Sequence, residues 1–335
     1  MARLVLVLLG LLTACGPLAR ISRITGPTFD EATFARKSIP SFTLPAARPG
    51  QPADTVIGEL RTYRIRQGDT LIDIARYYDL GYNELVEANP GVDPWVPRVG
   101  ATITLPTAWV LPCCTYEGVV VNIPEMRLYH YAPAGGGKLL VHTYPVGLGR
   151  DDRRTPRGKF KVAGKTVNPQ WNIPESIRQE HIRERDDARH FIRGGAPDNP
   201  LGRYRVELGH SLYSIHGTDI PWGVGMQVSH GCVRLYPEDV EQLFPLVAVG
   251  TAVEFTYQPV KLGMRGRAAY VEVHRDIYRY TRSLYANALG VLRRQGLGPG
   301  IDRDRLRAAT RDAVGVPVRV SEDHAGSREV SAHTP

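Results

Sequence analysis

The sequence has no dense run of lysine and arginine, and beyond its first residues it has no apolar stretch long enough to span a membrane. The 335 residues nevertheless carry a net charge of +8. Because no basic cluster marks a nucleic-acid surface, we expect no nucleic-acid partner. The charge is compatible with attraction toward a polyanionic surrounding or with simple solvation.

The first residues, MARLVLVLLGLLTACG, combine one arginine with a short apolar run. This pattern predicts a signal peptide over residues 1–15 and not a membrane-spanning helix. The small residues before Cys15 resemble a bacterial lipobox, which implies that Cys15 becomes the lipidated first residue. The alternative is a plain secretory signal with an incidental cysteine. A lipid on Cys15 predicts a membrane-anchored protein of the periplasm.

Cysteine is scarce, with four residues in the whole chain. Export would place them in an oxidising compartment, where thiols tend to be paired. Cys113 and Cys114 are adjacent, and a strained vicinal disulfide, burial and intermolecular pairing all remain open for them. Cys232 has no obvious partner, and a leftover thiol in an exported protein is a candidate reactive group.

The chain is predicted to be mainly β, and α+β overall, because its 34 glycines and 26 prolines favour turns and a strand-rich fold. Residues 16–60 are rich in proline and alanine with weak periodicity, which predicts an extended tether. Residues 117–257 carry short alternating apolar stretches typical of strands. Within them, the charged segment 165–200 predicts a partly helical excursion that could act as a lid.

The last segment, 258–335, is predicted to be an extension of the strand-rich domain. We expect one strand near Tyr270 to His274, a short helix from Asp302, and a disordered tail after about residue 320. Between the strand and that helix, apolar residues at helical spacing predict an amphipathic helix. These residues are Ile277, Tyr280, Leu284, Ala288 and Val291.

Residues 61–106 form a compact unit of strand, two helices and strand. Thr70 is a plausible cap for the first helix and Asn83 for the second. The first helix has one apolar face, made by Leu71, Ile74, Ala75 and Tyr78. The segments YRIRQGDTLIDIA, NELVEANP and VGATITLP resemble the LysM module. That resemblance implies a small βααβ domain that binds N-acetylglucosamine-containing glycans such as peptidoglycan.

The stretch IHGTDIPWGVGMQVSHGCVRLY gathers groups that nucleophilic catalysis needs. On a strand, His230 and Cys232 would point to one face, and His216 would end a neighbouring strand beside them. An imidazole lowers the pKa of a thiol or accepts its proton, and the thiolate attacks a carbonyl. Gly231 lets the backbone turn so that N–H groups face an oxyanion. Arg234 would hold a substrate carboxylate or order the loop.

Three other interpretations of this stretch remain open. Zinc could use His216, His230 and Cys232, but the usual spacing and a fourth ligand are missing. A disulfide from Cys232 to Cys113 or Cys114 would leave the two histidines unexplained. A buried structural cysteine would leave them unexplained as well. The nucleophile hypothesis explains more of these residues, and we expect no metal or organic cofactor.

The pattern IHGT followed by SHGCVRL resembles the signature of the L,D-transpeptidases of the YkuD family. TPRGKF, YPVGLGR and NPLGRYRVEL resemble that family too, so the resemblance covers residues 117–257. It implies a β-rich, sandwich-like catalytic domain in which Cys232 is the nucleophile. His216 is then the proton acceptor and donor, oriented by the backbone near Gly217.

The same resemblance assigns the remaining motif residues. Ser229, His230 and Gly231 would shape the pocket around the nucleophile, and Arg234 would support substrate binding. Ser229 is expected to be a structural hydrogen-bonding residue and not a second nucleophile. The segment YVEVH resembles Gram-negative envelope members that carry an N-terminal LysM module.

The implied reaction is acyl transfer on peptidoglycan. Cys232 would attack the peptide bond after meso-diaminopimelate in a tetrapeptide stem, and D-alanine would leave. The thioester would pass to an amine of a second stem or to a lysine of an outer-membrane lipoprotein, with a slight preference for the lysine. Two alternatives are a hydrolase that uses the same site and a non-catalytic lipoprotein that binds peptidoglycan through its LysM module alone.

Overall fold

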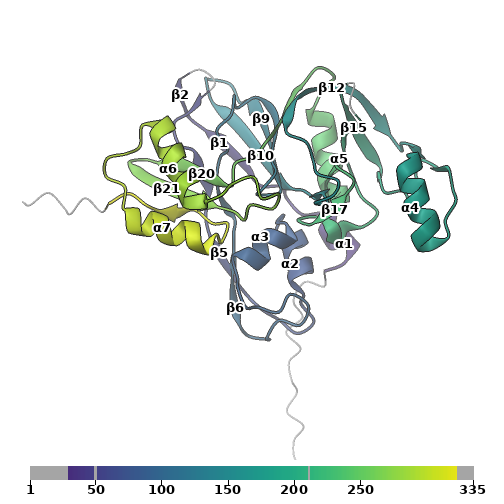
Figure 1. The fold of residues 1–335 in the computed structure, drawn as a ribbon, viewed down its shortest axis with the longest axis horizontal. Coiled ribbons are helices and arrows are strands. Elements are labelled where there is room, and N and C mark those ends of the chain that lie inside the picture. The colour runs from purple at the N-terminus through teal and green to yellow at the C-terminus, as the bar shows by residue number, and fades with distance from the viewer. Residues whose placement is uncertain (1–28, 49–50, 210–211, 323–335) are drawn as a thin grey trace, which may run out of the picture.

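The computed structural model describes residues 29–48, 51–209 and 212–322 (Figure 1). Strands hold 31% of the residues and helices 22%, which confirms the prediction of a mainly β, α+β fold. The described part of the chain contains no helix that could cross a membrane. The predicted signal peptide with Cys15 and the end of the predicted tail lie outside the described residues.

The described chain has short helices between its strands. They are α1 (Glu31–Phe34), α2 (Leu71–Tyr77), α3 (Tyr82–Glu87), α4 (Glu175–Arg185), the 3-10 helix η1 (Pro221–Gly223), α5 (Pro237–Leu246), α6 (Leu284–Gln295) and α7 (Arg303–Asp312). Figure 1 shows α6 and α7 at one end of the long axis and α4 at the other.

A nine-stranded sheet forms the frame of the molecule, in the order β1-β10-β9-β8-β19-β12-β15-β16-β18. Most neighbours are antiparallel, but β8 pairs with β19, and β16 with β18, in parallel. In sheet order the strands are Ser41–Leu44, Leu139–Pro145, Arg127–Pro133, Gly118–Asn122, Ala252–Thr256, Gly158–Val167, Tyr204–Leu208, Ser214–His216 and Val233–Arg234.

The middle of this sheet is covered on both faces. In β8, Val119 and Val121 pack in the apolar cluster that α5 closes with Val240 and Leu243. Val120 points the other way, into a second apolar cluster. Because both faces are buried, β8 reads as a continuous apolar run and not as a polar–apolar alternation.

The second cluster is shared with the unit at 61–106. This unit contains β5 (Arg61–Arg64), α2, α3 and β6 (Thr102–Leu105), which confirms the predicted strand, helix, helix, strand order. Thr70 caps α2 by accepting the N–H of Asp73 at 3.1 Å. The predicted cap at Asn83 is wrong. The N-cap is Gly81, two residues earlier, and its N–H donates to the Glu84 carboxylate at 2.7 Å. Asn83 therefore lies inside the helix.

The turn that starts α3 docks onto the sheet through buried charges. The Arg127 guanidinium of β9 holds the Glu84 carboxylate with two contacts of 2.9 Å and donates to the Asp79 carbonyl at 2.8 Å. The backbone N–H groups of Tyr82 and Asn83 donate to the carbonyls of Val224 and Gly225, both at 3.3 Å. The LysM-like unit therefore touches the loop that precedes the cysteine motif.

The prediction of a tether over residues 16–60 is wrong for its described part. β1 joins the edge of the large sheet by pairing with β10. β2 (Ala46–Arg48) pairs with β3 (Gln51–Pro52), and β4 (Val56–Gly58) pairs with β7 (Ala108–Val110). The Lys37 ammonium lies 2.7 Å from Asp79 and 2.8 Å from Asp239, both buried. Prolines suggested an extended chain, but strand pairing and these ion pairs fix the segment against the body.

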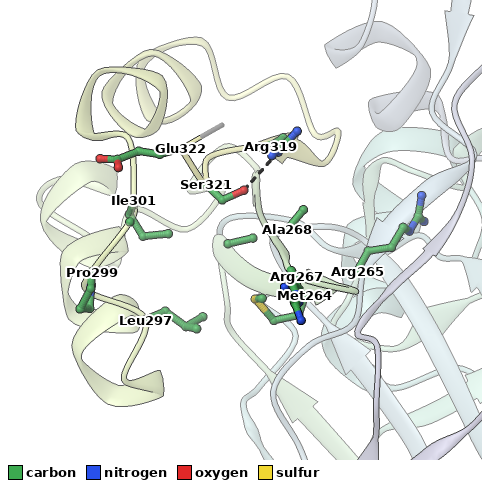
Figure 2. Close-up of a pocket in the computed structure, with 12 residues that line it drawn as sticks. Met264, Arg265, Arg267, Ala268, Leu297, Pro299, Ile301, Arg319, Ser321 and Glu322 are labelled. Carbon is green, nitrogen blue, oxygen red and sulfur yellow. Dashed lines mark hydrogen bonds between the residues drawn. The ribbon is translucent and has the colours of Figure 1, made fainter. Parts of the chain in front are cut away.

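The C-terminal segment builds a third apolar cluster. β20 (Val260–Arg265), β21 (Ala268–Val273) and β22 (Val318–Arg319) form a sheet against which α6 and α7 pack. The predicted short helix from Asp302 is confirmed as α7, and Asp302 is its cap. The predicted amphipathic helix begins at Leu284, so Ile277 and Tyr280 lie outside it. A cavity of about 520 Å³ separates Leu297, Pro299 and Ile301 from the β20–β21 hairpin (Figure 2).

A buried ionic cluster joins the unit at 61–106, the strand-rich domain at 117–257 and the C-terminal segment. Lys261 of β20 lies 2.7 Å from Glu125 and 2.9 Å from Glu272. His274 lies 2.6 Å from Glu272 and 3.7 Å from Glu87 of α3. Burial disfavours the charged imidazole, but the carboxylates of Glu272 and Glu87 raise the pKa of His274 to about 10. The ammonium and the imidazolium together compensate carboxylates that are otherwise shut off from water.

Replacing Lys261 by methionine should destabilise the protein strongly. The substitution preserves most of the side-chain volume but leaves Glu125 and Glu272 with an uncompensated buried charge. We expect the free energy of unfolding in urea to fall by about 3–5 kcal/mol. The exposed Lys159 provides a matched control, since Lys159→Met should change the same quantity by less than about 0.5 kcal/mol. Equal effects of the two substitutions would contradict the role given to the cluster.

Candidate active site

The cysteine motif lies on a tight turn between two short strands. β17 (Gln227–Ser229) ends just before His230, and β18 begins just after Cys232. The prediction that His230 and Cys232 share one face of a strand is therefore wrong. Gly231 has a φ of +109°, which breaks the strand and turns the chain.

Ser229 closes this turn. Its hydroxyl donates to the carbonyl of Cys232 at 2.6 Å and accepts the N–H of Gly231 at 3.1 Å. On the other side, the Thr155 hydroxyl donates to the Gly231 carbonyl at 3.1 Å. These bonds hold the backbone around the thiol, so the hydroxyl of Ser229 is committed to the turn.

The strand β16 lies next to the thiol. The Cys232 Sγ is 3.6 Å from the Ser214 Oγ and 3.9 Å from the Leu212 carbonyl. The parallel pairing of β16 with β18 sets His216 opposite Arg234. Ser214 and His216 are two residues apart on a strand and both are buried, so they share a face. Sequence reasoning did not identify Ser214 as a neighbour of the thiol, although Ser214 is two residues before His216 and so lies on the same face of a strand.

The His216 imidazole is buried and held by its own backbone. Its Nδ1 lies 2.7 Å from the Gly217 carbonyl, so we assign the proton of the neutral ring to Nδ1 and the lone pair to Nε2. Burial and the nearby Arg234 charge lower the pKa of His216 to about 3, against the opposing effect of the Gly217 carbonyl. The ring is therefore neutral near pH 7 and able to accept a proton.

Arg234 is anchored by its backbone, and the Nε of its side chain is buried. Its N–H and carbonyl pair with Gly147 at 2.9 and 2.8 Å. Burial lowers the pKa of the guanidinium, against the opposing charges of Asp219 and Cys232. Its Nε is buried without a hydrogen-bond partner among the described residues.

His230 faces away from Cys232 and His216, toward the charged segment 165–200. Its Nε2 lies 3.0 Å from the Glu180 carboxylate of α4 and 3.3 Å from the Arg150 guanidinium. The predicted partly helical segment contains α4, as expected. The strands β13 (Trp171–Asn172) and β14 (Phe191–Ile192), which flank α4 in sequence, pair with each other. Sequence reasoning missed Glu180, because no local pattern links it to a turn fifty residues further along the chain.

The motif does not form a metal or disulfide site in the described structure. His216 and His230 direct ring nitrogens at different partners, Gly217 and Glu180. Cys113, Cys114 and Cys232 are free thiols. Among the described residues, only Glu125, Glu272 and His274 are grouped closely enough for a metal, and the Lys261 ammonium already lies against both carboxylates.

Replacing Gly231 by alanine should change the reactivity of the Cys232 thiol. A Cβ there would lie 2.7 Å from a ring carbon of Tyr213, at a φ that L-residues rarely adopt. We expect the turn to shift and the rate of Cys232 alkylation by iodoacetamide, followed by peptide mass spectrometry, to change at least about tenfold.

Gly266→Ala is the matched control. Gly266 also has a positive φ, of +57°, but an added Cβ meets nothing within 4 Å. Both variants should lose about 1 kcal/mol of stability from backbone strain, whereas only Gly231→Ala should alter alkylation. Unchanged alkylation in Gly231→Ala would contradict the role assigned to the turn.

Comparisons with known proteins point to one enzyme family. The family model for the L,D-transpeptidase catalytic domain (YkuD) matches residues 117–255, and the model for the LysM domain matches residues 63–106. The chain is 34% identical over 307 residues to the probable L,D-transpeptidase ErfK/SrfK of Escherichia coli (strain K12), which covers 89% of this chain and 96% of that protein.

Two further relatives come from the same organism. The probable L,D-transpeptidase YcfS is 37% identical over 236 residues, or 68% of this chain and 72% of that protein. The probable L,D-transpeptidase YbiS is 38% identical over 226 residues, or 66% of this chain and 72% of that protein. The chain therefore belongs to the L,D-transpeptidase family, with a YkuD catalytic domain preceded by a LysM domain.

Proposed function

We propose that this protein is a cysteine acyltransferase that acts on the stem peptides of peptidoglycan. The observation that carries the proposal is the position of Cys232, on a glycine turn beside the strand that ends in a buried, neutral His216. A thiol and a neutral imidazole, held here by paired neighbouring strands, are the groups that nucleophilic acyl transfer requires. The LysM domain supplies a binding function for the glycan to which the stems are attached.

In the first half-reaction His216 takes the proton of the Cys232 thiol. The thiolate attacks the carbonyl carbon of the bond between meso-diaminopimelate and D-alanine. Backbone N–H groups of the turn other than that of Gly231, which donates to the Ser229 hydroxyl, stabilise the oxyanion. The carbon–nitrogen bond then breaks, His216 returns the proton to the leaving amine, and D-alanine departs, which leaves a thioester on Cys232.

In the second half-reaction an amine attacks the thioester. The amine loses its proton to His216, an amide bond forms, and the thiol leaves with that proton restored. Arg234, which pairs in register with His216, supports the substrate. We propose a lysine of an outer-membrane lipoprotein as the first acceptor to test and the amine of a second stem as the other.

The proposed location follows from the proposed substrate. Peptidoglycan lies in the periplasm, and the predicted signal peptide with its lipobox-like Cys15 would export the chain and anchor it to a membrane. The charge of +8 would draw the protein toward polyanionic envelope material.

Cys232→Ala should abolish transfer and leave glycan binding intact. The substitution removes the nucleophile at a turn that the hydroxyls of Ser229 and Thr155 still hold. We expect no thioester by intact-protein mass spectrometry and no new cross-links by muropeptide analysis, with unchanged pull-down by peptidoglycan. Persistence of the wild-type muropeptide profile would favour a purely binding function, and hydrolysed stems as the sole product of the wild type would favour a hydrolase.

The titration of His216 should not affect kcat/KM near neutral pH. An exposed histidine titrates near pH 6.5, but burial lowers the pKa of His216 to about 3. The base is therefore unprotonated throughout the range from about pH 5 to 8, and kcat/KM should show no acid limb with a midpoint between about 6 and 7. An acid limb of the wild-type profile with a midpoint in that range would contradict the assignment.

A further inference from the structure

A carboxylate-binding site lies beside the nucleophile, and a side chain of this protein fills it. The Arg150 guanidinium contacts both oxygens of the Glu180 carboxylate, at 2.9 and 3.4 Å. His230 Nε2 contacts the second oxygen at 3.0 Å. An arginine fork with one further nitrogen donor is a typical receptor for a carboxylate.

This site is part of the catalytic turn. The backbone N–H of Arg150 donates to the carbonyl of Ser229 at 2.9 Å. His230 lies between Ser229 and the Gly231–Cys232 pair. A carboxylate held by Arg150 and His230 therefore lies at the same turn that carries Cys232, because His230 is two residues before Cys232 and Arg150 is bonded to Ser229. The Arg150 side chain is 35% exposed, so a ligand from solution can reach it.

The side chain that fills the site comes from a separately packed element. α4 rests on a small cluster of its own, formed by Ile173, Ile177 and Ile192. That cluster is distinct from the large clusters on the two faces of the sheet. Figure 1 shows α4 at the far end of the molecule, beyond β12 and β15. Glu180 can withdraw without opening either large cluster.

We propose that Arg150 and His230 bind a carboxylate of the donor stem and that Glu180 occupies their site until the stem displaces it. This inference rests on the proposed function, in which the donor contains meso-diaminopimelate. That residue carries a free carboxylate at the far end of its side chain, on the same residue as the carbonyl that Cys232 attacks. Glu180 then competes with the substrate, and α4 moves off the catalytic turn when the stem binds.

The competing explanation is that Glu180 merely positions His230. The two explanations predict opposite changes in the Michaelis constant. A competitor that is weakened lets the substrate bind more tightly, so KM falls. A positioning group that is weakened leaves the turn less ordered, so kcat falls or KM rises for every donor alike.

The experiment compares two donors in the full-length protein. One is a tetrapeptide stem with a free diaminopimelate carboxylate, and the other carries an amide at that carboxylate. Glu180→Gln should lower KM for the first donor about two- to fivefold, which is the range for a partly exposed ion pair, and leave KM for the second unchanged. Arg150→Gln should raise KM for the first donor and leave the second unchanged.

Glu184→Gln provides the matched control, with the same change of charge one helical turn away at an exposed position. It should leave KM unchanged for both donors. A KM that is unchanged or raised in Glu180→Gln, or that shifts equally for the two donors, would overturn the proposed site. A wild-type protein inactive on both donors would overturn the proposed function, and this inference with it.

Discussion

The short parallel pairing of β16 with β18 is the constraint on which the site depends. It brings His216, the last residue of one strand, into register with Arg234 and next to the turn that carries Cys232. The segment between the strands spans sixteen positions, yet their separation in space is that of hydrogen-bonded neighbours. Because β16 is also bonded to β15, the imidazole is fixed by the large sheet and not by a loop. Burial in that position keeps the ring neutral, which is the protonation state that a general base needs.

The LysM domain is attached to this site more closely than a module on a linker. Its α3 begins against the carbonyls of Val224 and Gly225, in the loop that leads to β17 and the cysteine turn. The contact requires glycine, because a Cβ on Gly225 would lie 2.3 Å from the Tyr82 nitrogen. Arg127 and Glu84 secure the same turn from the sheet. The domain that is expected to hold the glycan and the domain that acts on its stems therefore form one body.

Charge serves two different purposes in the molecule. In the interior, the ion pairs of Lys261 and Arg127 have almost no access to water and bind the units together, so the loss of one partner is costly. At the mouth of the site, the pair of Arg150 with Glu180 is partly exposed and weaker, which makes an exchange of one carboxylate for another feasible. The two kinds of ion pair differ in their access to water.

The sequence by itself determined the chemistry and much of the order of elements. Cys232, His216, Gly231 and Arg234 were identifiable because their residue types and spacing are local, and the helices of the LysM domain followed from periodicity and from Thr70. Only the tertiary structure decided the rest. Gly231 had predicted a turn, and the structure showed what surrounds it: the ring of Tyr213 leaves no room for a Cβ, and the distant Thr155 hydroxyl donates to the Gly231 carbonyl. The structure paired β1 with β10 although prolines had suggested a tether. It also brought Glu180 to His230 across fifty residues, a contact that arises from folding and leaves no trace in local pattern.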